Sequence, residues 1–354
     1  MEKVLVAMSG GVDSSLAAWL TKEKGFDCSG AVMKLFPDGQ IKKRSGCGGM
    51  PANDAEDARA AALCIGIPFY VFDFTECFDS GVVQKFVKAY KNGLTPNPCV
   101  DCNRFIKFGA FLSKALEIGC DRMVTGHYAR IETDNGRYLL KKGIDTSKDQ
   151  SYVLYTMTQE QLSRTMLPLG GLTKAEVRET AREMGFINAK KRDSQDICFV
   201  PDGDYAGFIE RYTKTPAEKG RFKDSAGNDL GEHKGIEHYT VGQRKGLGIS
   251  AETPVYVRAV CPENNTVVVG NSGELYSKIL TASDINLIAV DGIEKPMRVK
   301  AKIRYRQPEQ PAAVRQTGPD TLSVEFDEPQ RAITKGQAVV LYDGDVVIGG
   351  GTIS

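Results

Sequence analysis

The chain has 354 residues, of which 41% are hydrophobic, and a formal net charge of +1. This length suits two or three domains with apolar cores, and the small charge argues against a globally basic nucleic-acid-binding protein, so that any such surface must be local. No apolar run approaches the roughly 18 residues of a membrane-spanning helix, and a predicted strand follows Met1 almost at once, so we expect neither a membrane partner nor a signal peptide. The nine cysteines are too sparse for a small disulfide scaffold and favour a cytoplasmic protein with a few reactive thiols.

The segment Lys3–Ser15, KVLVAMSGGVDSS, predicts a strand, a glycine turn and a helix start in direct succession. Val4–Met8 is a short apolar run typical of a buried parallel strand, and Ser9-Gly10-Gly11 ends it before a helix resumes near Leu16. Convergent backbone N–H groups and the helix dipole make such a turn an anion site. The segment lacks the Gly-Lys-Ser/Thr end of a Walker A loop. The alternative interpretation is an ordinary turn between a strand and a helix.

Asp13 is the unusual residue of this turn. A carboxylate beside a bound phosphate is repulsive unless it meets Mg²⁺ or caps the helix. Asp13 therefore favours a metal-bound nucleotide as the ligand.

Strands and helices alternate through the first part of the chain. Further strands are predicted over Cys28–Phe36, Pro68–Asp73 and Met123–Thr125, and helices over Asp54–Leu63, over Phe78–Tyr90 and from Asn103 onward. This alternation predicts an α/β domain with a doubly wound parallel sheet. Open parallel sheets bind ligands at the carboxyl ends of their strands, so Met33 either packs on an adenine ring or belongs to the core. The glycine-rich, basic stretch Gln40–Ala52 is expected to form a mobile loop.

The regular alternation of strands and helices does not continue through the rest of the chain. Asp134-Asn135-Gly136 predicts a hairpin between Tyr128–Glu132 and Arg137–Lys141, and Thr173 with Glu176 predicts a helix capping box. Residues 206–272 indicate a short helix among glycine-rich loops, in a small central α+β domain. From residue 273 onward, alternating strands and turns predict a C-terminal β-barrel.

Cys99 and Cys102 lie in the sequence PNPCVDC, just before a predicted helix. The dipole at a helix N-terminus stabilises a thiolate, which predicts nucleophilic thiols, and the C-x-x-C spacing also suits a redox pair or metal ligation. Cys198 follows a basic run, Lys190-Lys191-Arg192. The alternative for all three cysteines is that they are small buried side chains. His127 is either structural or catalytic, and the loop Lys148-Asp149-Gln150 either contacts nucleic acid or is plain solvated surface.

Seven motifs carry a resemblance to a known family. SGGVDS resembles the phosphate loop of the N-type ATP pyrophosphatases (PP-loop enzymes), which activate a carbonyl by adenylation. The ordered set SGGVDSS, TPNPxxxCNxxIKF, TGHY, KDQSYxLY, ICF, YTVGQRKGLGI and IRYRQ spans nearly the whole chain and resembles the bacterial tRNA-specific 2-thiouridylases, transferases that thiolate the wobble uridine of tRNA. The resemblance implies an adenylation domain over 1–205, a central tRNA-contacting domain over 206–272 and a tRNA-binding barrel over 273–354.

The resemblance also implies a role for each matching residue. The expected ATP-binding residues are Ala7, Met8, Ser9, Gly10, Gly11, Val12, Asp13 and Ser14 at the phosphates, with Met33 and Gly126 at the adenosine. The expected contacts to the flipped-out target base are Asn97, Pro98 and Cys99. The expected tRNA-binding residues are His127, Lys148, Asp149, Gln150, Arg304, Tyr305 and Gln337. Cys102 matches the attacking nucleophile and Cys198 the persulfide carrier.

The implied reaction has two steps. The uridine O2 attacks the α-phosphate of ATP and pyrophosphate leaves, with Mg²⁺ and the loop amides stabilising its charge. A Cys198 persulfide, loaded by a cysteine desulfurase or a sulfur-relay protein, then supplies sulfur to C2, either directly or as sulfide released by the Cys102 thiolate. AMP departs, and a Cys102–Cys198 disulfide remains for a reductant to open.

One departure from the family pattern leaves alternatives open. Many members have aspartate at the position of Cys99, and a thiol is a poorer proton acceptor because of its higher intrinsic pKa. Cys99, Cys102 and Cys198 would instead hold three irons of a [4Fe–4S] cluster that carries the sulfide. Two further alternatives are a PP-loop synthetase that amidates a small molecule and a non-enzymatic, tRNA-binding iron-sulfur scaffold.

Overall fold

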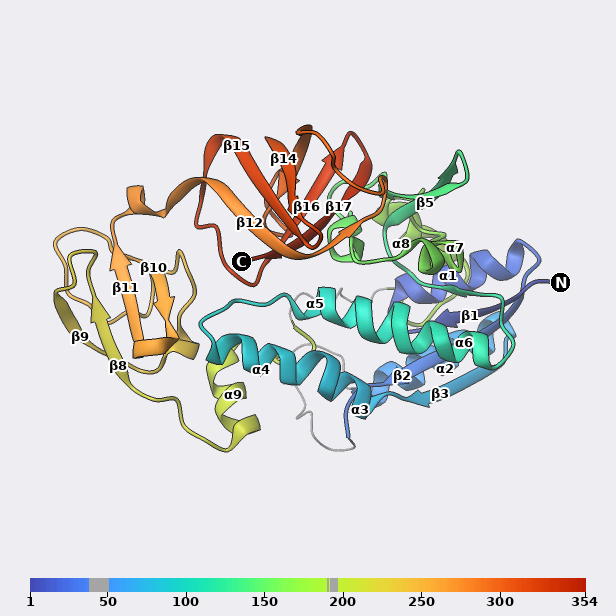
Figure 1. Cartoon of the computed structure of the whole chain (residues 1–354). Coiled ribbons are helices and arrows are strands. Elements are labelled where there is room, and N and C mark those ends of the chain that lie inside the picture. Colours follow the sequence, from blue (N-terminus) through green and yellow to red (C-terminus); the bar gives the residue numbers. More distant parts are fainter. Residues whose placement is uncertain (38–50, 190, 192–196) are drawn as a thin grey trace. The chain divides into compact units, whose positions relative to one another are not determined.

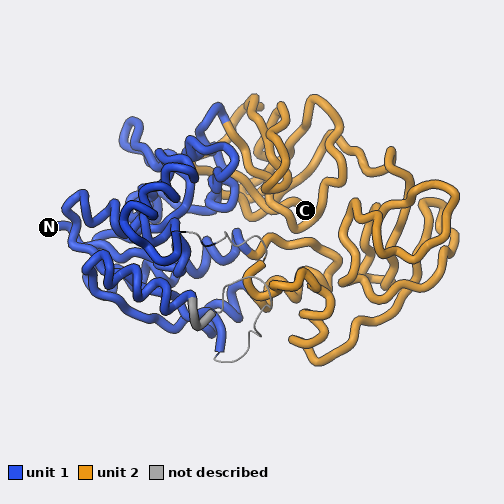
Figure 2. Tube along the Cα trace, turned by 180° about the vertical axis from the view of Figure 1, so that it is seen from behind, with its two compact units in different colours: residues 1–82, 99–195, 343–349 blue, residues 83–98, 196–342, 350–354 orange. Residues whose placement is uncertain are grey.

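The structure is a computed structural model that describes residues 1–37, 51–189, 191 and 197–354, without the side chains of 51–53. Backbone contacts divide the chain into two compact units (Figure 2). Unit 1 comprises residues 1–82, 99–195 and 343–349, and unit 2 comprises residues 83–98, 196–342 and 350–354. The expected mobile loop Gln40–Ala52 lies outside the described residues except at its end, where a helix already begins at Pro51.

A five-stranded sheet forms the centre of unit 1. Its strands are β1 (Lys3–Ala7), β2 (Asp27–Lys34), β3 (Phe69–Asp73), β4 (Arg122–Val124) and β7 (Thr165–Met166). They lie in the order β3-β2-β1-β4-β7, and neighbouring strands pair in parallel. Val4, Leu5 and Val6 are fully buried because β1 is central in the sheet, which explains its continuous apolar run. The predicted parallel α/β sheet is confirmed.

Small side chains let the helices of unit 1 approach the sheet and one another. The helices are α1 (Val12–Glu23), α2 (Pro51–Ile65), α3 (Thr75–Phe78), α5 (Pro98–Asp101), α6 (Leu112–Glu117), α7 (Gln159–Ser163) and α8 (Lys174–Glu183). Ala17 of α1, Ala58 of α2 and Ala181 of α8 are fully buried in one cluster with β1. The predicted capping box of Thr173 and Glu176 is confirmed at the start of α8.

Two helical stretches of the described residues are wound as π-helices. One covers Asp79–Val83 and the other Cys102–Phe111, so the expected single helix Phe78–Tyr90 is divided into α3, a π-turn and α4 (Gln84–Lys91). A π-helix is wider than an α-helix and is often found at functional positions. The predicted hairpin is confirmed as β5 (Ala129–Asp134) and β6 (Arg137–Lys142), joined through Asn135 and Gly136, which both have positive φ.

Unit 2 contains a four-stranded sheet, which agrees with the predicted small α+β domain, although its individual strands were not located in the sequence. Its strands are β8 (Gly220–Lys223), β9 (Asp229–His233), β10 (Tyr256–Cys261) and β11 (Thr266–Gly270), in the order β10-β11-β8-β9. The expectation of glycine-rich loops over 206–272 was wrong for these segments, because the strands are short and two of the three pairings are interrupted by register shifts. The expected short helix is present as α9 (Tyr205–Thr213).

The C-terminal part of the chain forms a closed barrel (Figure 1). Its strands are β12 (Tyr276–Leu287), β13 (Met297–Lys302), β14 (Gln310–Gly318), β15 (Thr321–Arg331), β16 (Ala338–Asp343) and β17 (Val346–Ile353). The order β12-β15-β14-β13-β16-β17 is closed by pairing of β12 with β17, and Val314, Val324 and Phe326 fill the interior. The predicted barrel is confirmed. Among the described residues, no helix is both long and apolar enough to cross a membrane.

Candidate nucleotide and thiol site

The turn between β1 and α1 has the backbone of an anion site. Gly10 adopts φ +72°, and a Cβ at this position would overlap the carbonyl oxygen of Asp54 in α2. Only glycine satisfies both constraints. Gly11 is the N-cap of α1, a 12-residue helix, and no side chain of the described residues caps it. The N–H groups at the start of α1 are therefore available to a phosphate.

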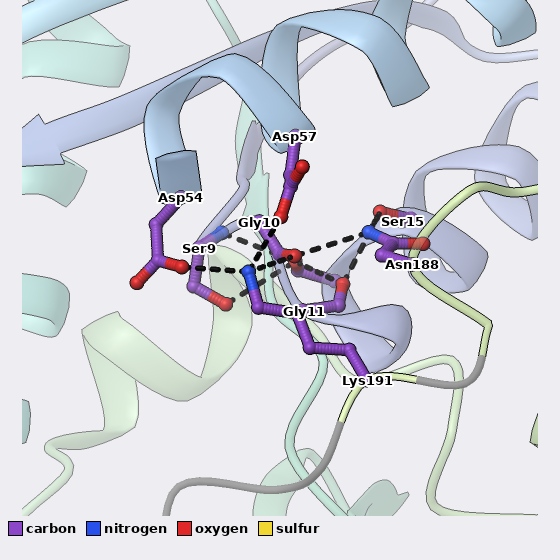
Figure 3. A network of polar contacts seen from close by, with 9 residues as sticks. Ser9, Gly10, Gly11, Ser15, Asp54, Asp57, Asn188 and Lys191 are labelled. Carbon is purple, nitrogen blue, oxygen red and sulfur yellow. Dashed lines mark hydrogen bonds and ion pairs between the residues drawn. The ribbon is translucent and has the colours of Figure 1, made fainter. Parts of the chain in front are cut away.

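Serine hydroxyls hold this turn closed on itself (Figure 3). The Oγ of Ser14 accepts a hydrogen bond from the backbone N–H of Ser9 and donates one to the carbonyl of Gly11, both at 3.1 Å. Ser15 Oγ lies 3.2 Å from the same carbonyl. The Gly11 carbonyl is therefore held by two hydroxyl donors, which preorganises the turn before a ligand arrives.

Asp13 has partners that the sequence analysis missed. Its carboxylate lies 2.7 and 2.8 Å from the ammonium of Lys174 at the start of α8, and the hydroxyl of Tyr128 donates to it at 2.7 Å. Lys174 is only 8% exposed, so its charge is well sheltered from water. Lys174 therefore offsets the carboxylate charge in a way the sequence did not suggest, and coordination of Mg²⁺ by Asp13 stays a prediction.

Two residues that are distant in sequence, Asn188 and Lys191, also hold the turn by hydrogen bonds. Asn188 Nδ2 donates to the carbonyl of Gly10 at 3.1 Å and to Ser15 Oγ at 2.9 Å. Lys191 Nζ donates to the same Gly10 carbonyl at 3.2 Å, and it contacts Asp54 and Asp57 at 2.6 Å each.

The other predicted ATP-binding residues lie around this turn. Ala7, Met8 and Val12 are buried, so contacts from these residues to a nucleotide would come from their backbone. Met33 is half-buried at the carboxyl end of β2. A Cβ on Gly126 would lie 2.8 Å from backbone atoms of Asp13 and Ser14, so only glycine lets the end of β4 approach the start of α1 this closely. Their contacts to ATP stay predictions.

The thiols of Cys99 and Cys102 lie at the start of the second π-helical stretch. Cys99 is in α5, and Cys102 is the first residue of the π-helix. Desolvation raises the pKa of Cys102, the positive charge of Lys107 lowers it in part, and Cys99 and Asp101 raise it further. On balance burial raises the pKa of this thiol, against the expectation of a lowered pKa at a helix start, and the role of Cys102 as the nucleophile stays a prediction. Lys107 is the residue that favours the thiolate, and it was missed.

His127 holds Lys107 in place. Lys107 Nζ lies 3.3 Å from His127 Nε2, and the hydroxyl of Thr125 lies 2.7 Å from His127 Nδ1. An ammonium can only donate, so Nε2 must accept and Nδ1 must carry the ring proton. Burial, aided by the charge of Lys107, holds the pKa of His127 well below its usual value. The ring is buried, and its contact to tRNA stays a prediction.

The loop Lys148-Asp149-Gln150 is anchored within unit 1. The side-chain oxygen of Gln150 accepts from the backbone N–H of Tyr128 at 3.0 Å. Asp149 accepts backbone hydrogen bonds from Gly143 and Ser151 at 3.1 Å each. The carboxylate and the amide thus fix the loop, and the predicted tRNA contacts of its three residues stay predictions.

Cys198 belongs to unit 2, whereas Cys102 belongs to unit 1. Cys198 is exposed, and the next residue, Phe199, is buried. The ring of Phe199 lies 5.1 Å from that of Phe86 in α4 and 5.2 Å from that of Phe208 in α9. This aromatic packing anchors the chain immediately after the Cys198 thiol. The pairing of Cys102 with Cys198 stays a prediction.

Gln337 and Arg304 border a cavity of about 260 Å³ within unit 2. Its lining residues are Thr95, Thr240, Val241, Gly242, Arg304, Thr334 and Gln337. Gln337 Nε2 donates to the carbonyls of Thr95 and Pro96 at 2.8 and 3.3 Å, and Arg304 Nη2 donates to the carbonyl of Ala332 at 2.6 Å. Gln337 thus holds the segment that leads to Asn97 and Pro98, while Tyr305 is exposed. The tRNA contacts predicted for Arg304, Tyr305 and Gln337 stay predictions.

Comparison with known families assigns the class of the chain first. Residues 2–202 match the family described as tRNA methyl transferase HUP domain, residues 206–271 a tRNA methyl transferase PRC-barrel domain, and residues 277–353 an aminomethyltransferase beta-barrel domain. The chain is therefore a HUP-domain protein with two appended barrel-type domains. The exact boundaries predicted from the sequence stay a prediction.

Comparison with individual proteins then gives the family. The chain is 52% identical to the tRNA-specific 2-thiouridylase MnmA of Clostridioides difficile (strain 630), over 99% of this chain and 98% of that protein. It is 51% identical to the protein of the same name from Acetivibrio thermocellus, over 99% of both. The chain belongs to the tRNA-specific 2-thiouridylase family, as its motifs predicted. A solved 4-thiouridine synthetase–RNA complex with bound ATP is 19% identical, with a TM-score of 0.38, and covers 56% of this chain and 45% of that one.

Proposed function

We propose that the protein is an ATP-dependent sulfurtransferase that converts the wobble uridine of tRNA to 2-thiouridine. One observation carries the proposal: unit 1 combines a glycine turn at a helix start, without a side-chain cap among the described residues, with a half-buried thiol, Cys102, whose raised pKa is offset in part by the charge of Lys107. The first element suits a polyphosphate and the second a nucleophile. Membership of the thiouridylase family over the whole chain supports the combination.

The turn is suited to the activation step. ATP enters with Mg²⁺ as its substrate complex, and the amides at the start of α1 would bind its phosphates. The uridine O2 forms a bond to the α-phosphorus while the bond to pyrophosphate breaks. Pre-aligned amides would stabilise the charge that develops on the leaving pyrophosphate. The product is an O2-adenylated uridine, whose C2 now carries a good leaving group.

The thiols are suited to the second step. A persulfide on Cys198, supplied by a persulfide donor, attacks C2 with its outer sulfur, and AMP leaves with the former O2. The Cys102 thiolate then attacks the Cys198 sulfur and breaks the S–S bond, which leaves the outer sulfur on C2. The enzyme is left with a Cys102–Cys198 disulfide, and a dithiol reductant supplies two electrons and two protons to reopen it. Cys99 stands where aspartate is common and would exchange the uridine proton.

The iron-sulfur alternative stays a prediction that no group of the described residues supports. Among those residues, no group of three His, Cys, Asp or Glu side chains gathers in a way that would hold a metal ion. We therefore derive no step through a cluster.

The activation step is tested by pyrophosphate release. Purified protein, ATP and Mg²⁺ are mixed with an unmodified tRNA bearing uridine at the wobble position, and with the same tRNA bearing cytidine there as the control. We expect pyrophosphate and AMP only with the uridine tRNA. Release that needs ammonia or glutamine and ignores tRNA would support the amidating-synthetase alternative. Binding of the tRNA without release of pyrophosphate would support the non-enzymatic scaffold.

A further inference from the structure

The ammonium of Lys191 is held by carboxylates at the edge of the nucleotide turn (Figure 3). Its Nζ lies 2.6 Å from Asp54 Oδ1 and 2.6 Å from Asp57 Oδ2, while the Gly10 carbonyl lies 3.2 Å away. Both acids come from the first turns of α2, and Gly10 is the glycine on which the turn depends. One lysine therefore joins the turn to a pair of negative charges.

These charges do not balance. Desolvation lowers the pKa of Lys191, but hydrogen bonds and attraction from Asp54 and Asp57 outweigh it and raise the pKa above its usual value, so the ammonium stays charged. Within this cluster of described residues, one ammonium faces two carboxylates, so the cluster itself carries a net negative charge beside a turn suited to an anion. A polyphosphate that approaches the turn is repelled by the acids and attracted by Lys191.

The exposed fractions of the three side chains indicate which of them loses its partner at the lowest cost in free energy. The side chain of Lys191 is 19% exposed, whereas Asp54 is 44% and Asp57 27% exposed. The more exposed carboxylates regain water when their partner leaves, whereas the ammonium, which is the least exposed group of the three, needs another anion. The long, flexible lysine side chain allows such an exchange without movement of α2. Asn188 continues to hold the Gly10 carbonyl at 3.1 Å, so the turn keeps its shape.

We propose that Lys191 is a positioning residue of the nucleotide site that exchanges partners, bound to Asp54 and Asp57 in the empty turn and to the polyphosphate of ATP in the occupied one. Asp54 and Asp57 then oppose nucleotide binding by competing for the lysine. This inference rests on the proposed use of ATP. It adds Lys191 to the nucleotide site, together with competition between the two aspartates and the polyphosphate for its ammonium.

The test is ATP affinity, measured by isothermal titration calorimetry with Mg²⁺ and without tRNA. Loss of one charged hydrogen bond corresponds to about a tenfold to hundredfold weaker Kd, which we expect for Lys191→Met. Asp57→Asn frees the lysine and is expected to tighten the Kd by about threefold. Lys191→Arg is expected to remain within about threefold of wild type. A lysine that serves only as a structural strut would give the opposite sign for Asp57→Asn, because loss of its partner loosens the turn.

Lys22→Met is the matched control. Lys22 also joins α1 to the end of α2, because its ammonium donates to the carbonyls of Ile65 and Gly66. Neither hydrogen bond involves the nucleotide turn, so the Kd for ATP should not change. If Lys191→Met does not fold, as judged by its circular dichroism, Asp57→Asn and Lys191→Arg still decide the matter. An unchanged or weaker Kd for Asp57→Asn would overturn the inference while wild-type binding leaves the proposed function intact. Absence of ATP binding by the wild type would contradict the proposed function itself.

Discussion

Lys107 Nζ lies 3.3 Å from Nε2 of the buried His127, and this contact links the TGHY segment after β4 to the helix that begins at Cys102. Cys102 and Lys107 are five residues apart in a π-helix, whose i→i+5 hydrogen bonding brings such positions onto one face. The lysine charge favours the Cys102 thiolate against the desolvation that opposes it. Lys107 therefore joins the histidine to the segment that carries the thiol.

Lys107→Met is predicted to slow alkylation of Cys102 by iodoacetamide by about tenfold at about pH 8, since loss of the cation raises the thiol pKa further. Alkylation is followed by mass spectrometry of the peptide that contains Cys102, in a Cys99→Ser background that leaves one thiol in that peptide. Lys114→Met is the control, because Lys114 pairs with Glu117 at the surface. An equal slowing in both variants would show that Lys107 has no specific effect on the thiol.

Gly10→Ala is predicted to weaken ATP binding by at least about tenfold, because the added methyl group would overlap the Asp54 carbonyl and because φ +72° is strained for alanine. Gly25→Ala is the matched variant: Gly25 has φ +84°, and its Cβ would meet nothing within 4 Å. It carries only the conformational cost of about 1 kcal/mol. Equal ATP affinities in the two variants would contradict the close approach of α2 to the turn.

Lys174→Met is predicted to lower the free energy of unfolding of unit 1 by about 1–2 kcal/mol. The reason is that Asp13 loses an ammonium at 2.7 Å whose own side chain is only 10% exposed. The figure is small for a sheltered pair because the Asp13 side chain is 29% exposed and regains water. Urea denaturation of wild type, Lys174→Met, Asp13→Asn and the double variant gives the coupling energy. Additive effects would mean that the ion pair does not contribute.

Acid is predicted to destabilise the sheet of β8–β11 through His233. The ring is 1% exposed, its Nδ1 accepts from the N–H of Gly235 at 3.0 Å, and its Nε2 donates to the carbonyl of Asn265 at 3.1 Å. Burial lowers the pKa of His233, so the folded chain binds fewer protons than the unfolded chain. The stability this gives is present above the unfolded pKa of about 6.5 and is lost as pH falls below it.

Comparison with His233→Gln separates this residue from the other buried histidine, His127. The midpoint of urea unfolding, followed with a probe in unit 2, should fall less between about pH 7.5 and pH 5 in the variant than in the wild type. Equal losses would mean that His233 does not carry the pH dependence.

Local pattern was enough for the elements that are themselves local. The apolar run of β1, the Asn135-Gly136 turn and the Thr173–Glu176 cap each lie within a few residues, and the structure contains all three. The central domain was predicted as α+β, but its strands could not be located, because β8 has only four residues and its pairing with β9 shifts register. Strand β7, with two residues, is too short to show a period.

Two site residues were not predicted from the sequence for the same reason. Lys174 meets Asp13 across 161 positions of sequence, and Lys191 meets Gly10 across 181. No periodicity connects residues so far apart, because the fold alone brings them together. Lys107 was easier to predict from the sequence, since it lies in the same motif as Cys102, five residues further along the chain. A π-helical register, which a 3.6-residue period does not anticipate, places it with the thiol.

The proposed persulfide mechanism is tested by formation of 2-thiouridine by iron-free protein supplied with ATP, Mg²⁺, tRNA and a persulfide donor, measured by mass spectrometry of the tRNA nucleosides. We predict 2-thiouridine with the wild type and none above background with Cys102→Ser or Cys198→Ser, although both variants still release pyrophosphate. Activity that requires bound iron, or wild-type thiolation by Cys198→Ser, would contradict the persulfide mechanism.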